Sequence, residues 1–344
     1  MSKMNKQIVL KSRPEGEPTE DNFGVVETPI PTPGDGQILV KVIYMSLDPY
    51  MRGRMSAAKS YSASAEIDKP MLGGGVGVVE QSNNNNFAVG DYVVCATGWQ
   101  SYCLSDGTGV LKIDPDNAPI STGVGVLGMP GLTAYYGLLK IGQPKAGETV
   151  VVAAASGAVG SVVGQIAKIK GCRAVGIAGS AEKCAFVVDE LGFDACLNYK
   201  APDFKEELAA ACPDGIDVYF ENVGGDVFEA VLPLFNDDAR VPLCGLISQY
   251  NATELPTGTN MLPALMRDML TKRILIQGFI ISFHFDLLPQ FLKDVGGWIT
   301  SGELKYREDI VEGIENAPEA FMGLLKGKNF GKLLVRVAED PTRN

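Results

Sequence analysis

Three glycines that follow an apolar run are spaced so that the backbone between them can hold a phosphate group. The stretch AAASGAVGSVVG (153–164) leads from this run into a pattern of apolar residues at helical spacing. In such a strand, turn and helix, Gly157 permits a tight turn, Gly160 lets the backbone approach a pyrophosphate and Gly164 lets the helix lie close to the sheet. The N–H groups that open the helix then face the phosphates. The stretch therefore predicts a dinucleotide site. Because Ala154 replaces the first glycine of the usual pattern, a purely structural turn remains the alternative.

The residues after the next apolar run distinguish between the two nicotinamide dinucleotides. Sites for NAD usually carry an acidic residue about 20 positions on, which binds the ribose 2′-hydroxyl. Here Gly179 stands at that position, followed by Ser180 and Lys183, which suit a 2′-phosphate because it needs donors and positive charge. Ser180 is also a good helix N-cap, a second reading that is compatible with the first. Glu182 argues against a phosphate, but the pattern as a whole favours NADPH.

Alternating strands and helices from residue 149 onward predict the element that positions these residues. Six apolar runs, most of them separated by helical segments, predict a doubly wound parallel sheet. Ligands of such sheets bind beyond the carboxyl ends of the strands. The expected strands are 150–153, 174–178, 195–198, 217–221, 240–247 and 274–280.

The first part of the chain has a different pattern. Before residue 125, short β-rich runs are broken by Gly and Pro, which is typical of a barrel-like domain. A helix at 318–325 and a strand at 332–337 return to this style at the end of the chain. We therefore expect an α/β protein in which residues 126–300 form a nucleotide-binding domain inserted between the two parts of a barrel-like domain, 1–125 and 301–344.

Composition limits the partners and the compartment. The 344 residues carry a formal net charge of −11, and no basic stretch is long enough for a nucleic-acid surface. The N-terminus lacks the apolar core of a signal peptide, and no membrane-spanning apolar run occurs, so we expect no membrane association. Seven cysteines form no CxxC pair, which is typical of reduced thiols in a cytoplasmic protein.

Nine motifs, taken together, resemble a known family. The motifs are LDPYMRGRM (47–55), LGMPGLTAYYGL (127–138), AASGAVGSVVGQIAK (154–168), AGSAEK (178–183), GFDACLNYK (192–200), GIDVYFENVGG (215–225), CGLISQYN (244–251), IQGFIIS (276–282) and GKNFGKLLV (327–335). In this order they resemble the zinc-independent medium-chain dehydrogenase/reductases. Within that superfamily, the chain is similar to the leukotriene/prostaglandin reductase and plant double-bond reductase group, and most of all to its bacterial NADPH-dependent curcumin/dihydrocurcumin reductases.

The resemblance implies a fold and an activity. The fold would be a GroES-like β-barrel catalytic domain with an inserted Rossmann domain, assembled as a homodimer. The activity would be the NADPH-dependent reduction of the C=C bond of α,β-unsaturated ketones and aldehydes, so the partner would be a small apolar enone. Hydride would go to the β-carbon, and tyrosine or ribose hydroxyls would stabilise the enolate.

The residues themselves argue against the zinc-dependent branch of this superfamily. Catalytic zinc in alcohol dehydrogenases needs Cys and His ligands, but His284 is the one histidine of the chain. Residues 73–75 are three glycines where zinc enzymes carry a His-Glu pair, and no cluster of four cysteines could hold a structural zinc. We therefore expect no metal.

Without metal or histidine, the plausible hydrogen-bond donors to an enolate are tyrosine hydroxyls and the cofactor ribose. Tyr250, in ISQYN, follows the fifth expected strand at its carboxyl end. Tyr50, in DPYMRGRM, lies in a loop that the family places over the nicotinamide. We expect both to contact substrate, although buried tyrosines with ordinary structural roles are common.

The remaining cofactor contacts are implied by the resemblance. Ala158 and Val159, beside Gly157 and Gly160, resemble the family's pyrophosphate contacts, and Ser180, Lys183 and Tyr199 resemble its 2′-phosphate site. Further residues of the motifs would line the rest of the cofactor: Asn222, Cys244, Gly245, Phe279, Met129, Thr133 and Asn329. A turn residue is the alternative for Asn329, because Asn and Gly are favoured at helix ends.

Two other functions remain open at this point. One is a quinone oxidoreductase of the same superfamily, which would reduce simple quinones. The other is a non-catalytic NADPH-binding protein that keeps the fold. The DPYMRGRM and ISQYN motifs favour the enone reductase.

Overall fold

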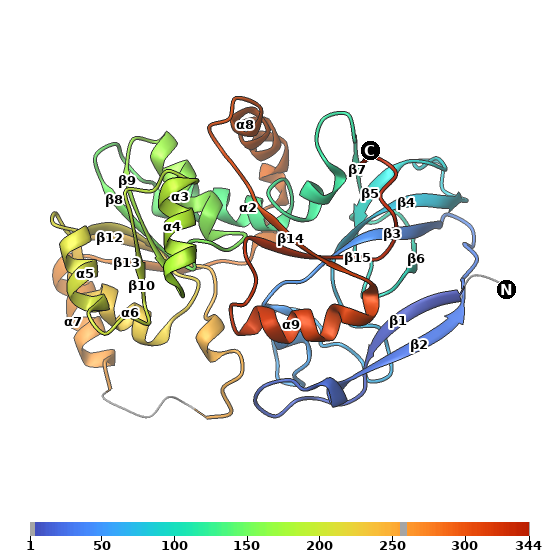
Figure 1. The fold of residues 1–344 in the computed structure, drawn as a ribbon, viewed down its shortest axis with the longest axis horizontal. Coiled ribbons are helices and arrows are strands. Elements are labelled where there is room, and N and C mark those ends of the chain that lie inside the picture. The colour runs from blue at the N-terminus through green and yellow to red at the C-terminus, as the bar shows by residue number, and fades with distance from the viewer. Residues whose placement is uncertain (1–3, 255–259, 344) are drawn as a thin grey trace. The chain divides into compact units, whose positions relative to one another are not determined.

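The computed structural model describes residues 4–254 and 260–343 (Figure 1). The chain divides into two compact units. One unit combines Met1–Gly128 with Glu308–Asn344, and the other is Met129–Arg307. We call them the discontinuous unit and the continuous unit.

The continuous unit is built on a parallel sheet. Among the described residues its strands follow the order β10-β9-β8-β11-β12-β13, and every neighbouring pair is parallel. The order reverses next to β8, the first of these strands in the chain, which is the arrangement of a doubly wound dinucleotide-binding sheet. The strands are β8 (Thr149–Ala153), β9 (Arg173–Ala178), β10 (Ala195–Asn198), β11 (Ile216–Phe220), β12 (Phe235–Leu243) and β13 (Leu275–Gly278).

Helices flank this sheet (Figure 1). They are α2 (Met129–Tyr136), α3 (Gly160–Ile169), α4 (Ala181–Asp189), α5 (Phe204–Ala211), α6 (Gly225–Val231), α7 (Leu262–Lys272) and α8 (Leu288–Thr300). β8 is completely buried and apolar from Val150 to Ala153, as expected for a central parallel strand covered on both faces. The apolar side chains of α3, including Val162, Val163 and Ile166, are buried as well. Each such side chain contributes roughly 1.5–3 kcal/mol to folding.

The discontinuous unit is built mainly from antiparallel strands. Its larger sheet follows the order β14-β15-β3-β4-β5-β7 among the described residues, β6 pairs with β3, and a separate hairpin joins β1 to β2. The strands are β1 (Met4–Leu10), β2 (Phe23–Pro29), β3 (Ile38–Ser46), β4 (Gly75–Ser82), β5 (Tyr92–Cys95), β6 (Tyr102–Ser105), β7 (Leu111–Ile113), β14 (Glu308–Glu312) and β15 (Lys332–Arg336). Its α-helices are α1 (Met51–Arg54) and α9 (Ala317–Leu325).

An aromatic group anchors one core of this unit. Trp99 is fully buried, stacks on Phe23 and meets Phe321 of α9 edge to face. The fully buried Met51 and Met55 pack into the same cluster. The two chain segments of the unit therefore share one apolar core.

The predicted fold class, an α/β protein with a parallel Rossmann sheet and a second unit of mainly antiparallel strands, is confirmed. Two details differ from the prediction. The strand expected at 240–247 ends at Leu243, because the N–H groups of Cys244 and Gly245 turn to the carbonyl of Glu221. Strands β6 and β14 were not predicted. β14 is the edge strand EDIVE, whose three acids hide its β character.

No helix within the described ranges is long and apolar enough to cross a membrane.

Candidate functional site

The carboxyl ends of the parallel strands gather most of the predicted cofactor residues on one edge of the sheet. The glycine turn follows β8, Gly179 follows β9, Tyr199 follows β10 and Asn222 comes shortly after β11. Cys244 and Gly245 follow β12, and Phe279 follows β13. Because all six strands run in the same direction, these positions share one edge.

The turn after β8 has the shape that a pyrophosphate site requires, but not at the expected residue. Ala154 takes a left-handed conformation, with a φ of 54°, so the sharp turn occurs at Ala154 rather than at Gly157. Gly157 donates a hydrogen bond from its N–H to the carbonyl of Ala154 at 2.9 Å. A Cβ on Gly160 would lie 2.3 Å from that same carbonyl oxygen, and a Cβ on Gly164 would lie 1.8 Å from the ring of Phe193. These last two positions accept only glycine.

Two backbone donors of this turn are available to a ligand. Within residues 4–254 and 260–343, no acceptor binds the N–H of Ala158 or of Val159, and both residues are partly exposed. They immediately precede α3, whose N-terminus carries partial positive charge. An anion placed here would therefore find both donors and a favourable field.

A polar group forms where β9 and β10 end. Ser180 is the N-cap of α4, and its hydroxyl accepts a hydrogen bond from the N–H of Lys183 at 3.2 Å, as predicted. Tyr199 donates its N–H to Ala178, and its ring lies 3.1 Å from where a Cβ on Gly179 would be. The glycine therefore leaves room for the tyrosine ring beside the start of α4.

One cation at this place was not predicted. The ammonium of Lys200 lies 5.6 Å from the centre of the Tyr199 ring, and both side chains are exposed. The signal was available in the sequence, since Lys200 follows Tyr199 directly. Lys183, Tyr199 and Lys200 together can supply the donors and positive charge that a phosphate needs.

The ends of β11 and β12 are tied together by Glu221, a residue that the sequence analysis did not single out. Its buried carboxylate accepts the N–H groups of Val223 and Gly224 at 2.6 and 2.9 Å. Burial raises the pKa of Glu221 above its usual value, although these backbone hydrogen bonds act to lower it. Asn222 donates its amide to the carbonyl of Ala153 at 2.8 Å, which joins β11 to the turn after β8.

The thiol of Cys244 and the phenol of Tyr250 lie at the end of β12. Burial, and then the charge of Glu221, raises the pKa of Cys244 to about 12, so this thiol is no nucleophile at neutral pH. The Tyr250 hydroxyl lies 3.0 Å from where a Cβ on Gly245 would be, and the N–H of Leu246 donates to it at 3.4 Å. The structure therefore places the Tyr250 hydroxyl against a predicted cofactor-lining residue.

An aromatic group lies between α2 and the end of β13. Phe279 packs against Tyr136 and Phe220 with ring centres 5.3 and 6.4 Å apart. His284 stacks on Tyr136 at 3.9 Å. Phe279 is therefore held by neighbours of its own unit.

The two predicted residues of α2 interact with each other. The Thr133 hydroxyl donates to the carbonyl of Met129 at 2.7 Å. Their contact with a cofactor stays a prediction.

Tyr50 belongs to the discontinuous unit, where a network of hydrogen bonds fixes its segment. The ammonium of Lys332 donates to the carboxylate of Asp48 at 2.7 Å and to the carbonyl of Leu47 at 2.8 Å. Ser46 donates its hydroxyl to the same carboxylate. Tyr50 then stands just before α1, and burial, followed by the charge of Asp48, raises the pKa of its phenol well above the ordinary value. The phenol therefore keeps its proton at neutral pH and can act as a donor.

Asn329 lies in the turn between α9 and β15, where its amide donates to the carbonyl of Gly331 at 2.8 Å. This bond is that of the turn residue considered as the alternative. A contact of Asn329 with a cofactor stays a prediction.

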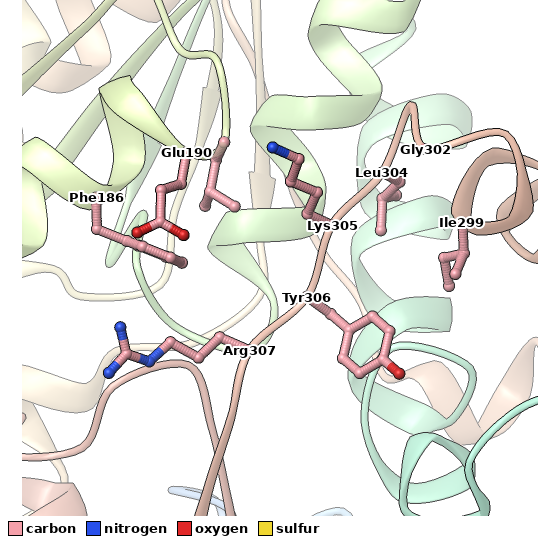
Figure 2. Close-up of a pocket in the computed structure, with 9 residues that line it drawn as sticks. Phe186, Glu190, Ile299, Gly302, Leu304, Lys305, Tyr306 and Arg307 are labelled. Atoms are coloured by element: carbon pink, nitrogen blue, oxygen red, sulfur yellow. The ribbon is translucent and has the colours of Figure 1, made fainter.

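Figure 2 shows an open hollow of about 440 Å³ elsewhere in the continuous unit, between the end of α4 and residues 299–307. Phe186 and Glu190 line it from the α4 side, and Lys305 and Arg307 line it from the other. None of the predicted site residues contributes to its lining. Ser180 and Lys183 stand at the opposite end of α4.

Metal ligands do not cluster in the part of the chain that the structure describes. There, His, Cys, Asp and Glu nowhere form a group of three or more that could hold a metal ion. All seven cysteines are free.

Known proteins similar to this chain agree on the kind of enzyme. Residues 6–113 match the family described as "N-terminal domain of oxidoreductase", and residues 158–294 match that described as "Zinc-binding dehydrogenase". The chain is 55% identical over 337 residues to the NADPH-dependent curcumin reductase of Escherichia coli (strain K12), covering 98% of both. It is 44% identical over 337 residues to prostaglandin reductase 1 of Rattus norvegicus, covering 96% of this chain and 98% of that one.

A solved structure agrees with the fold. The crystal structure of CurA in complex with NADPH from Vibrio vulnificus superposes with a TM-score of 0.95 at 56% identity, covering 97% of this chain and 100% of that chain.

Proposed function

We propose that this chain, which belongs to the medium-chain dehydrogenase/reductase superfamily in its prostaglandin reductase and alkenal reductase group, is an NADPH-dependent reductase of carbon–carbon double bonds. Its substrates are α,β-unsaturated ketones and aldehydes. The relative from Escherichia coli, named for curcumin, adds curcumin-type enones to this class.

One observation carries the proposal: a single sheet edge holds a glycine turn with unused backbone donors, the residues Lys183 and Lys200, and a tyrosine hydroxyl. Ala158 and Val159 offer N–H donors at the turn. Lys183 stands at the start of α4, where Gly179 replaces the carboxylate typical of NAD sites. The Tyr250 hydroxyl lies beyond β12 on the same edge.

The residues present fit NADPH. A backbone that approaches a pyrophosphate needs glycine at position 160, because the carbonyl of Ala154 leaves no space for a Cβ there. The N-cap bond of Ser180 directs the first turn of α4 toward the place where a 2′-phosphate would lie. We infer that Lys183 and Tyr199 hold that phosphate, and that Asn222, Cys244, Gly245, Phe279, Met129, Thr133 and Asn329 line the rest.

When bound, NADPH supplies the hydride that adds to the β-carbon of the enone. Negative charge then develops on the carbonyl oxygen of the substrate and must be stabilised by a positioned donor. We assign this hydrogen bond to the hydroxyls of Tyr250 and Tyr50. The raised pKa of Tyr50 keeps its phenol protonated at neutral pH. The α-carbon takes its proton from a phenol, from a ribose hydroxyl or from water.

The experiment that tests the proposal compares substrates of three kinds. Purified protein is mixed with NADPH and curcumin, a medium-chain 2-alkenal or a simple quinone, with NADH as the control cofactor. We expect NADPH-dependent loss of the enones, with no effect of EDTA because no residue of the proposed mechanism needs metal. Turnover of the quinone alone would indicate a quinone oxidoreductase. No NADPH oxidation with any of the three substrates would indicate a non-catalytic NADPH-binding protein.

We further propose that cofactor binding and substrate binding are assigned to different units. The continuous unit would bind NADPH, and the discontinuous unit would supply Tyr50 to the substrate. We place the functional boundaries of this division near residues 125 and 300.

We propose a homodimer that pairs the β13 edges. β13 is the last strand of its sheet, and Leu275 on it is 46% exposed. Met266 and Leu270 of α7 expose apolar surface as well. Unpaired edges and apolar patches are normally covered. Light scattering should give twice the chain mass of 36.6 kDa, and a mass of one chain would contradict the dimer. Free thiols throughout fit the cytoplasm, which fractionation of the source cells would test.

A further inference from the structure

Arg54 is the last residue of α1 and is a buried cation with a very unusual environment. It is 7% exposed, and its guanidinium contacts two aromatic rings, 5.4 Å from the centre of the Tyr50 ring and 4.5 Å from that of Tyr61. Cation–π contacts of this kind hold a guanidinium over a ring while leaving its N–H edge unused.

That edge makes no hydrogen bond or ion pair within residues 4–254 and 260–343. The other cations nearby are all engaged. Arg52 donates to the carbonyl of Gly16 at 2.7 Å, and Arg13 donates to those of Met55 and Ala65 at 3.0 and 2.9 Å. Most of the Arg54 side chain is buried, but its guanidinium keeps donors that no other described residue uses, so they are available to a ligand.

The edge of the Arg54 guanidinium is open to a ligand. The fully enclosed side-chain polar atoms without a partner belong, in the part of the chain that the structure describes, to Trp99, Tyr219, Glu221 and Glu308, and not to Arg54. The stem of Arg54 is therefore buried, while its nitrogens still reach the surface.

The arrangement is held rigidly. The N–H of Ala65 donates to the carbonyl of Arg54 at 2.8 Å, and Arg13 bridges the carbonyls of Met55 and Ala65. These bonds close the base of the segment that returns Tyr61 over Arg54. A fork of donors held in this way is pre-organised for an acceptor of fixed shape.

We propose that Arg54 is a specificity residue that binds a planar pair of oxygens on the substrate. The shared chemistry is two coplanar oxygens that carry a delocalised negative charge, as in a carboxylate or in the enolate of a 1,3-dicarbonyl compound. The guanidinium fork matches such a pair with two parallel hydrogen bonds. This inference rests on the proposed function, because the oxygen pair belongs to the enone substrate that the tyrosines serve.

The test uses three substrates that differ in this feature alone. They are 4-phenylbut-3-en-2-one, 6-phenylhex-5-ene-2,4-dione and 4-(4-carboxyphenyl)but-3-en-2-one. We expect Arg54→Met to lower kcat/KM about tenfold or more for the dione, the carboxylate or both, and less than about twofold for the plain enone. Arg54→Lys, which keeps the charge but loses the fork, should lie between the two. The substrate whose kcat/KM falls identifies the source of the oxygen pair, a 1,3-dicarbonyl compound or a carboxylate.

A binding measurement separates this inference from the proposed function. With NADP⁺ at saturation, calorimetry compares the saturated ligands 6-phenylhexane-2,4-dione, 4-(4-carboxyphenyl)butan-2-one and 4-phenylbutan-2-one. Arg54→Met should weaken one or both of the two-oxygen ligands and spare the third. Arg336→Met, which breaks a surface pair with Glu312, is the matched control and should change nothing.

Equal losses for all three compounds, or no loss for any, would overturn the assignment of Arg54. Failure of the wild-type protein to reduce any enone would instead overturn the proposed function, while the calorimetry would still report on Arg54. The melting temperature of each variant shows whether it is folded.

Discussion

Lys183 is the residue that should decide which cofactor is used. Removing it should remove a charge-assisted contact with the 2′-phosphate, which is roughly a tenfold effect or more. We therefore expect Lys183→Ala to raise the KM for NADPH more than about tenfold and to leave that for NADH unchanged. Steady-state kinetics with both cofactors check this, with Lys205→Ala on α5 as the control. Equal effects on NADPH and NADH would remove Lys183 from the phosphate site.

Tyr250 should act on the substrate rather than on the cofactor. Its hydroxyl lies beside Gly245, where it can donate a hydrogen bond to a developing enolate. Tyr250→Phe removes the donor and keeps the ring, so we expect a lower kcat/KM for enones with nearly unchanged NADPH affinity. Kinetics and a fluorescence titration with NADPH measure the two quantities. Wild-type activity in this variant would exclude Tyr250 from the mechanism.

The sequence indicates which residue types could form this site better than it indicates how their side chains are arranged. Gly179, Ser180 and Lys183 could be proposed from the sequence because a 2′-phosphate favours such residues at a strand end, and their contact with a cofactor stays a prediction. The contacts of Arg54 with two tyrosine rings could not, since Tyr61 returns over it through an irregular segment without periodicity. Nor does any pattern reveal that the carboxylate of Glu221 would fold back on its own backbone.

Among the elements, the turn after β8 stores strain at Ala154. A non-glycine residue in the left-handed region costs roughly 1–2 kcal/mol, which glycine does not incur. We expect Ala154→Gly to raise the free energy of unfolding by roughly 0.5–1 kcal/mol after the greater freedom of glycine in the unfolded chain is included. Denaturant unfolding measures the change.

The neighbouring residue provides the control for that substitution. Ala155 is fully buried and has no left-handed φ, so Ala155→Gly should destabilise the protein. A loss of stability in Ala154→Gly of the same size as in Ala155→Gly would show that the turn is unstrained.

An ion pair between Arg240 of β12 and Glu148, the residue before β8, joins these two strands. Burial acts to raise the pKa of Glu148, but hydrogen bonds from Arg240 and from the N–H of Lys145 lower it below 4.5 overall. A lowered pKa in the folded state stabilises the protein above the unfolded-state pKa, and this stabilisation is lost as the pH falls through the folded-state pKa. The free energy of unfolding should therefore decrease below about pH 4.5, and less steeply in Glu148→Gln.

The pairing itself can be verified with a double variant. Arg240 donates to Glu148 at 3.1 Å, so Glu148→Gln and Arg240→Met should not be additive. Additive losses of stability, or an unchanged pH slope in Glu148→Gln, would mean that other groups control acid unfolding.

Helices and strands with a regular pattern of apolar residues could be predicted from the sequence. Strands whose bounds depend on hydrogen bonds to a neighbouring strand could not. The central parallel strands β8, β9 and β11 are mostly apolar and buried, because helices cover both faces of such a sheet. β14 is recognisable only through its partner β15, since its sequence EDIVE is that of a charged surface segment. The end of β12 depends on a carbonyl from β11, which no local pattern encodes.

For the whole molecule, the resemblance of the motifs predicted the superfamily, and the fold and the relatives bear it out. The family description "Zinc-binding dehydrogenase" covers residues 158–294, yet the described residues hold no group of metal ligands.

The measurement that tests the central claim most directly follows the hydride itself. Purified protein is given NADPH with deuterium at the transferable C4 position and 4-phenylbut-3-en-2-one, and the product is analysed by NMR and mass spectrometry. Our account predicts 4-phenylbutan-2-one with one deuterium on the carbon that was β to the carbonyl and none on the α-carbon. An allylic alcohol with its double bond intact, or a saturated ketone without deuterium at that carbon, would contradict it.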